Sequence, residues 1–238
     1  MQQQSFSTLP EITKNLIILN LLMFLAVICL GEDITTRYLA IHYVQHEHFY
    51  PFQLVTGFFM HGGPMHLLFN MFTLFMFGSE VERVLGPKKF LFLYLSAGFG
   101  ANLLNMSVDY VQVQYLLEGL SSEQIAWSTG QLSKISSSLY VPQMDELARI
   151  WLTRSLGASG AVFGVLFTFA ALYPNRIVYL LIPPMPLKAK TLVLVLTVME
   201  FSLHISNLQT GIGHFVHLSG GAIAIFILWF WRKQGARF

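Results

Sequence analysis

Long stretches without Asp, Glu, Lys or Arg constrain this chain more than any other feature of its sequence. A charged side chain is costly at the centre of a lipid bilayer, which about 20 apolar residues can cross as a helix. Five long stretches are free of charge, the last of them except for Glu200: residues 15–31, 48–79, 90–108, 155–175 and 191–230. These stretches predict membrane-spanning helices.

The composition agrees with a lipid environment and excludes several other classes of protein. Hydrophobic residues make up 54% of the 238 residues and charged residues 11%, whereas a soluble domain carries about 25% charged residues. This hydrophobicity excludes a single soluble enzyme domain and a disordered chain. Cys29 is the one cysteine, which excludes a disulfide scaffold, and a net charge of +2 gives no basis for nucleic-acid binding.

Dividing the two longest stretches gives six predicted helices. Residues 48–79 exceed one span, and their centre, FMHGGPMHLLFN, favours an interfacial loop to about Gly63 before a helix. A break rich in Gly, Asn and Gln at 207–213 divides the last stretch. The sequence therefore predicts an all-α polytopic membrane protein, with six transmembrane helices over about 15–31, 65–78, 90–108, 155–175, 190–206 and 213–231.

Basic residues predict which side of the membrane each segment faces. With a cytoplasmic N-terminus, ten Lys and Arg residues lie inside and four outside, in line with the positive-inside rule. We therefore expect cytoplasmic tails at 1–14 and 232–238 and one membrane domain over 15–231. The polar segment 109–150 then lies outside, with one or two short amphipathic helices (VQYLLEGL, MDELARIWL), and the apolar segment 177–186 lies at the interface.

Three predicted helices begin with polar residues that can carry chemistry. The fourth opens at 157–160 with Gly-Ala-Ser-Gly, which is either a small-residue packing motif or an accessible serine. The sixth opens with His214 and His217, which can be hydrogen-bonding groups between helices, a metal pair or a general base. In the second, His66 and Asn70 share a helix face and can hold an oxyanion or join two helices. The topology puts all three clusters at a similar depth, as an acyl-transfer site requires.

These motifs resemble those of the rhomboid intramembrane serine proteases over about 52–231. The resemblance is carried by HGGPMHLLFN, by EVERVLG at 80–86, by GASGAVFG and by HLSGG. It implies a six-helix bundle of the bacterial type and a Ser–His dyad without a third, acidic member. Ser159 would be the nucleophile and His217 the general base, while His66, Asn70 and the Ser159 N–H would form the oxyanion hole.

The resemblance also implies supporting residues around the dyad. Glu82 matches a carboxylate that ties the cytoplasmic end of the second helix. Gly220 matches a glycine that lets the helix of His217 pack closely against the helix of Ser159. The full supporting set is Gly157, Gly160, Phe163, Gly220 and Glu82.

Three positions depart from the family pattern. Phe52-Gln53 stands in place of a Trp-Arg pair in the first outer loop, so the lipid-facing contacts of that loop are expected to differ. Phe163 stands where some members have Tyr, and its ring is expected to stack on His217 and to hold it by packing. Ala224 replaces a common glycine with another small residue.

The reaction that the resemblance implies is hydrolysis of peptide bonds in or near transmembrane segments of membrane-protein substrates. Substrate helices and the lipid bilayer are the expected partners, and no cofactor or metal is expected. Short cytoplasmic tails and the resemblance together suggest a bacterial inner membrane. A regular helix hides its carbonyl groups, so a substrate is expected to unwind near its outer end.

Two other interpretations remain open from the residues alone. A metal-dependent protease could use His61, His66, His214 and His217, although HExxH is absent and we expect no carboxylate beside them. A non-catalytic scaffold or transporter could use the intramembrane histidines and Glu200 as a proton path. That path would depend on Glu200, whereas the protease is expected to tolerate its loss. The outer-loop cluster His42, His46 and His48 is expected to be solvated.

Overall fold

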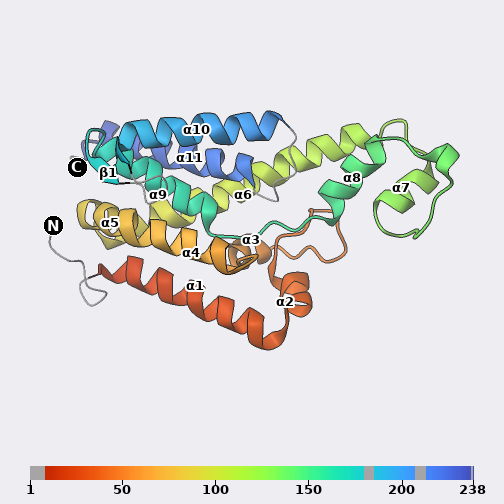
Figure 1. Ribbon diagram of the computed structural model, residues 1–238, viewed down its shortest axis with the longest axis horizontal. Helices are drawn as coiled ribbons and strands as arrows, with labels where there is room; N and C mark the ends of the chain where they lie inside the picture. The colour runs from red at the N-terminus through yellow and green to blue at the C-terminus, as the bar shows by residue number, and fades with distance from the viewer. Residues whose placement is uncertain (1–8, 180–184, 207–212, 237) are drawn as a thin grey trace.

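The computed structural model describes residues 9–179, 185–206, 213–236 and 238. Long helices laid side by side form a bundle, and a smaller helical part projects from one end of it (Figure 1). The elements in chain order are α1 Glu11–Leu30, α2 Glu32–Leu39, α3 Gln53–Thr56, a 3-10 turn Gly57–Phe59, α4 Pro64–Thr73, a π-helical turn Leu74–Gly78, α5 Ser79–Leu85, α6 Pro87–Leu117, α7 Ser122–Ser128, a 3-10 turn Ser137–Leu139, α8 Gln143–Leu152, α9 Ser159–Leu172, β1 Ile177–Tyr179, β2 Pro186–Lys188, α10 Ala189–Ile205 and α11 His214–Lys233.

The prediction of an all-α membrane protein is confirmed. Three helices, α1, α6 and α11, are long and apolar enough to cross a membrane. Helical structure also lies over the other predicted spans, with α4, the π-helical turn and α5 following one another without a break over 64–85. The count of six spans stays a prediction, and the expected break at 207–213 lies outside the described residues except for Gly213.

Helix α6 extends beyond the predicted span 90–108 in both directions. Its 31 residues correspond to about 46 Å, which exceeds the hydrocarbon thickness of a bilayer by about half. The chain contains no glycine or proline between Gly100 and Gly119, and Gly119 has a positive φ of 86° just after the helix ends. The segment VQYLLEGL was therefore wrongly expected to form a separate helix, since most of it is the end of α6.

The two ends of the bundle differ in what they hold. Figure 1 shows the start of α1 and the end of α11 at one end, together with α5 and the β1–β2 hairpin. Helices α4, α9 and α11 all begin toward the other end, as the predicted topology requires. Which end faces the cytoplasm stays a prediction. In the segment expected at the interface, β1 and β2 pair antiparallel, with Ile177 opposite Lys188.

Small residues bring the three central helices α6, α9 and α11 close together. Ala97 and Ala101 of α6, Ala161 of α9 and Ala224 of α11 are at most 1% exposed. Helices α1 and α10 cover this centre and turn large apolar side chains outward, including Leu22, Leu25 and Ile28 on α1 and Leu194, Val198 and Phe201 on α10. Exposed apolar surface of this extent is what a bilayer covers.

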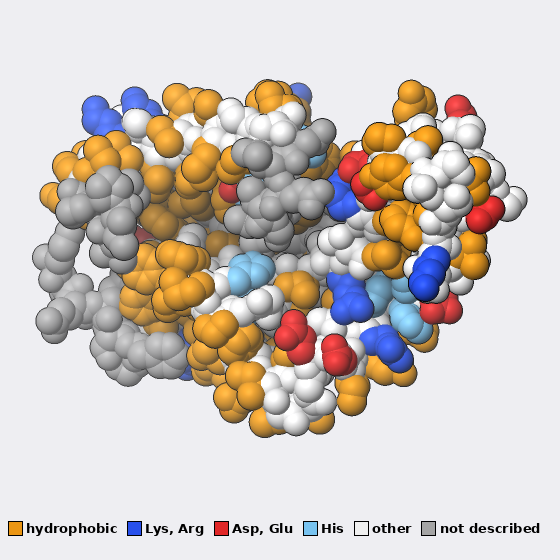
Figure 2. All heavy atoms as spheres, turned by 45° about the vertical axis from the view of Figure 1, so that its right-hand side comes forward, with side chains coloured by type: hydrophobic (Ala, Val, Ile, Leu, Met, Phe, Trp, Pro, Cys, Tyr) orange, Lys and Arg blue, Asp and Glu red, His pale blue; other side chains and the backbone are white. Residues whose placement is uncertain are grey.

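The projecting part has its own small hydrophobic cluster. Val113 and Leu116 at the end of α6 pack with Leu147 and Ile150 of α8 and with Tyr43 between α2 and α3. Acidic, basic and histidine side chains gather over the end of the molecule that carries α2, α7 and α8 (Figure 2). MDELARIWL forms most of α8, as expected, while α7 was not predicted.

Candidate active site

Backbone hydrogen bonds hold the segment that leads into α9. Ile41 and Ser155 exchange two backbone hydrogen bonds of 2.9 Å, and the Gly157 N–H donates to the Gly57 carbonyl at 2.8 Å. Gly157 has a φ of +124°, a backbone conformation that favours glycine. The sequence thus places Ser159 as the first residue of α9 by fixing the chain just before it against Ile41 and Gly57.

Gly157 also leaves room for the His66 ring. A Cβ atom built on Gly157 would lie 2.9 Å from His66 Nε2, 2.8 Å from His66 Cε1 and 3.8 Å from Ser159 Oγ. The imidazole of α4 and the hydroxyl of α9 therefore border the same small space, and any side chain at position 157 would occupy it.

Asn70 lies one turn after His66 on α4 and is 6% exposed. Its amide nitrogen Nδ2 is among the few buried side-chain polar atoms with no hydrogen-bond partner in the described part of the chain. Leaving a buried donor unpaired costs about 1–3 kcal/mol. A donor kept in this state is suited to an acceptor that is bound only during a reaction.

Helices α9 and α11 cross in backbone contact. A Cβ atom on Gly220 would lie 2.0 Å from the Gly160 carbonyl oxygen, and one on Gly164 would lie 3.1 Å from the Gly220 oxygen and 3.3 Å from the Ala224 Cβ. Only glycine fits at position 220, in agreement with the packing that the resemblance implies. The crossing lies directly after Ser159 on one helix and after His217 on the other.

The His217 ring is held by contacts on two sides. Phe163, one turn after Ser159 on α9, stacks on it with ring centroids 4.2 Å apart and planes inclined by 8°. At the ring edge, a Glu200 oxygen of α10 lies 3.0 Å from His217 Nδ1. The predicted stacking is therefore present, but packing is not the only restraint on this ring.

Glu200 is the site residue that the sequence analysis did not place. Its second oxygen contacts His214 Nδ1, and its side chain is 5% exposed. The expectation that no carboxylate lies beside these histidines was wrong, because α10 and α11 bring residues 14 and 17 positions apart into contact. One signal was visible: Glu200 interrupts an otherwise charge-free stretch, and a buried charge in an apolar helix requires partners.

The histidines do not gather as a metal site among the described residues, where no group of three His, Cys, Asp or Glu side chains is arranged to hold an ion. His61 and His66 meet edge to face, with ring centroids 5.0 Å apart. Between α2 and α3, His42 is buried rather than solvated as expected, and burial, followed by the charge of His46, lowers its pKa. Burial and then His48 lower the pKa of His46 in the same way.

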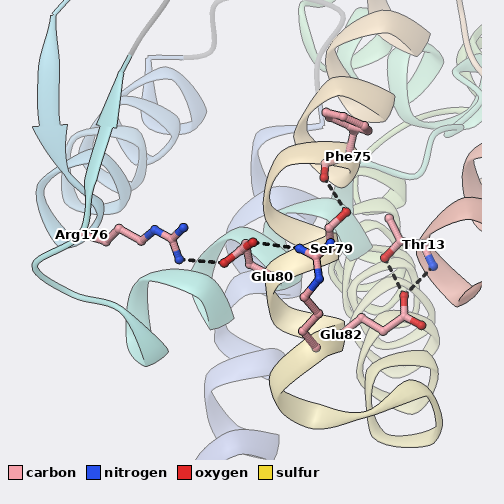
Figure 3. A network of polar contacts seen from close by, with 7 residues as sticks. Thr13, Phe75, Ser79, Glu80, Glu82 and Arg176 are labelled. Atoms are coloured by element: carbon pink, nitrogen blue, oxygen red, sulfur yellow. Dashed lines mark hydrogen bonds and ion pairs between the residues drawn. The ribbon is translucent and has the colours of Figure 1, made fainter. Parts of the chain in front are cut away.

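Glu82 lies at the other end of the bundle and joins α5 to the start of α1. Its carboxylate accepts hydrogen bonds from the Thr13 N–H and hydroxyl, both at 2.7 Å (Figure 3). It also accepts one from the Ile12 N–H at 2.9 Å. The first N–H groups of a helix have no partner within it, so Glu82 caps α1 from outside. Helix α1 consequently begins at Glu11, four residues before the predicted start.

Gln53 explains one departure from the family pattern. Its side chain is fully buried and donates to the carbonyls of Tyr38 at 3.2 Å and His48 at 2.8 Å, while its oxygen accepts from the His42 N–H at 3.3 Å. Phe52 beside it is 50% exposed. Gln53 therefore organises the segment between α2 and α3 from inside, and Phe52 supplies the outward contact.

Comparison with known proteins agrees with these features. The chain is 24% identical over 173 residues to the putative rhomboid protease YdcA of Bacillus subtilis, covering 71% of this chain and 61% of the relative. It is 25% identical to the rhomboid protease AarA of Providencia stuartii over 171 residues, covering 71% and 51% of the two chains. It is 29% identical to the mitochondrial rhomboid protein 1 of Saccharomyces cerevisiae over 128 residues, covering 54% and 27%.

In each of these matches the aligned region covers less than two thirds of the relative's length. The profile of the rhomboid domain matches residues 48–234, which include α4, α9, α10 and α11 and every residue of the candidate site. The apolar helices and this match together identify an integral membrane protein. The chain belongs to the rhomboid family.

Proposed function

We propose that this protein is an intramembrane serine protease that cleaves peptide bonds in or near transmembrane segments of membrane proteins. The observation that carries the proposal is the meeting of three helix starts. The His66 ring and Ser159 Oγ border the space beside Gly157, and the His217 ring stacks on Phe163 one turn from Ser159. The family and the names of its relatives support the same class of reaction.

The proposed reaction proceeds through an acyl-enzyme. His217 takes the proton of the Ser159 hydroxyl, and Oγ attacks the carbonyl carbon of the scissile bond. The carbonyl oxygen becomes negatively charged and accepts hydrogen bonds from Asn70 Nδ2, from His66 and from the Ser159 N–H, which as the first residue of α9 has no partner within the helix. His217 then returns the proton to the leaving nitrogen, and water hydrolyses the ester in the same way.

The substrates that we propose are transmembrane segments that unwind at the end of the bundle where α4, α9 and α11 begin. Charged and polar side chains over this end can admit the water that hydrolysis needs. We place the protein in a bacterial inner membrane, with both tails cytoplasmic. A transporter that uses Glu200 and the histidines as a proton path would have no use for Ser159.

An activity-based fluorophosphonate probe tests the proposal on detergent-purified protein. We expect labelling of the wild type, at least a 10³-fold slower reaction in Ser159→Ala and His217→Ala, and wild-type labelling in Ser155→Ala, a serine just outside α9. The same variants should rank identically in cleavage of a transmembrane reporter. Equal labelling of the wild type and Ser159→Ala would contradict the nucleophile. Proton flux in vesicles that persists in Ser159→Ala would favour the transporter instead.

A further inference from the structure

Glu200 is a carboxylate in the middle of a largely apolar helix, α10. Its neighbours Met199 and Phe201 on α10 are 45% and 56% exposed and face outward, whereas Glu200 is buried against α11. Burying a carboxylate without partners costs many kcal/mol, so the residue persists only where donors reach both of its oxygens. The partners of Glu200 therefore indicate its role.

Both oxygens of Glu200 meet imidazole nitrogens of the same helix face. One contacts His214 Nδ1, and the other lies 3.0 Å from His217 Nδ1. A carboxylate is an acceptor, so Nδ1 of His217 carries the hydrogen in this pair. The second nitrogen of His217, Nε2, is then the unprotonated one, as a general base for Ser159 requires.

We infer that Glu200 is the positioning residue of the site, completing a Ser159–His217–Glu200 arrangement in which His214 holds the carboxylate by its second oxygen. This inference rests on the proposed function. It departs from the dyad without an acidic member that the family resemblance implies, and it replaces the expectation that the protease tolerates the loss of Glu200.

Glu200 acts through His217 and touches no reacting atom. It fixes the tautomer and, together with Phe163 stacked on the ring face, the direction of the ring. When His217 takes the Ser159 proton, the ring becomes positive, and the adjacent carboxylate stabilises that charge. The proton stays on His217 until it passes to the leaving nitrogen, so Glu200 remains ionised throughout.

The test distinguishes this positioning role from a purely structural contact between α10 and α11. Glu200→Gln keeps the shape and one acceptor oxygen but removes the charge and places an N–H₂ group against one histidine. We expect kcat for a transmembrane reporter, and the fluorophosphonate labelling rate, to fall about 10²- to 10⁴-fold while KM changes less than about threefold. Glu123→Gln, the same change on the exposed side of α7, should label at the wild-type rate.

A second measurement needs no variant of Glu200. Nitrogen-15 NMR of labelled histidines in the wild type should show His217 protonated at Nδ1, with the signal assigned by its loss in His217→Gln. Protonation at Nε2 would overturn the inference, and so would a folded Glu200→Gln protein that labels within threefold of the wild-type rate. If the wild type itself does not label, the proposed protease activity fails instead, so the two failures are distinguishable.

Discussion

Glu82 and Glu200 are both buried carboxylates of one bundle, yet the chain satisfies them with partners of different kinds. Glu82 accepts from two backbone N–H groups and a hydroxyl, donors that keep their protons at every ordinary pH. Glu200 meets two imidazoles, groups whose ring nitrogens can give up or accept a proton. Fixed donors make a structural joint, whereas exchangeable donors make a group that can take part in proton transfer.

The surroundings of the two carboxylates differ in the same sense. Around Glu82 every oxygen is used, and Glu80 beside it forms an ion pair with Arg176 at 2.7 Å, joining α5 to the segment after α9 (Figure 3). At the end of the bundle where α4, α9 and α11 begin, the buried Asn70 amide nitrogen lacks a partner in the described residues. Both oxygens of Glu82 thus have donors, whereas the second region contains a buried donor that is available to a bound acceptor.

The largest expected difference between the two regions comes from a change at the crossing of α9 and α11, which serves only the second region. Gly220→Val puts a side chain where a Cβ alone would lie 2.0 Å from the Gly160 carbonyl oxygen, so α9 and α11 must separate. We expect labelling at the background level, because displacements of about 1 Å already cost about 10²-fold in rate. Hydrogen exchange at the Ile12 and Thr13 amides should stay as slow as in the wild type.

Ala222→Leu is the matched control, since it also adds three carbons to α11 but on the exposed side of the helix. It should retain wild-type labelling. Fast exchange at Ile12 and Thr13 in Gly220→Val would contradict the separation of the two regions.

Loss of the unpaired Asn70 amide should have the next largest effect on catalysis. Asn70→Ala should lower kcat about 10²- to 10³-fold with KM little changed, the loss typical of one oxyanion donor. Thermal stability should not fall by the cost of a hydrogen bond, because Asn70 Nδ2 makes none within the described residues. Kinetics on the transmembrane reporter and a thermal melt in detergent measure both.

Asn20→Ala provides the contrast on α1. Asn20 is also buried, but its amide donates to the Leu16 carbonyl at 2.7 Å, far along the chain from the catalytic motifs. Its loss should leave kcat unchanged. An Asn70→Ala protein with the wild-type kcat would contradict the assignment of Asn70 to the oxyanion hole.

The sequence predicts the frame of the molecule better than its contacts. Charge-free stretches locate the long helices, because one charge at mid-bilayer outweighs local preferences. Ser159, His66 and Asn70 could be singled out because each lies in a compact motif at a helix start. Glu200 stood out as a charge in an apolar stretch, but its place beside His217 could not be predicted, because its partners come from another helix and depend on how α10 lies against α11. The start of α1 was missed for the same reason, since Glu82 lies 69 residues from Thr13.

At the Glu82 end, a substitution should cost stability rather than catalysis. Glu82→Ala leaves three donors at the start of α1 without their acceptor and should lower the free energy of unfolding by about 2–4 kcal/mol. Thr13→Val removes only the hydroxyl donor and should cost about 1 kcal/mol. Denaturation in detergent measures both changes, and the labelling rate per folded molecule should match the wild type. A lower kcat in folded Thr13→Val would contradict the independence of the two regions.

A half-exposed carboxylate, Glu146, should give the smallest effect and provides the reference for the two buried ones. Glu146 on α8 pairs with Arg149 at 2.6 Å, with side chains 37% and 43% exposed. The hydrogen bonds from Arg149 hold the pKa of Glu146 below its usual value, so the pair stabilises the fold above about pH 4.5 and loses that contribution as the pH falls further. Glu146→Gln should therefore cost less than about 1 kcal/mol at pH 7, and the difference from the wild type should shrink between about pH 5 and pH 3. Water screens the Glu146–Arg149 pair and solvates the partner that remains, so the loss of the pair costs little. Glu82 is buried, and the donors that it satisfies would have no water in place of its carboxylate. A pH-independent difference, or one as large as that of Glu82→Ala, would mean that burial is not what separates these carboxylates.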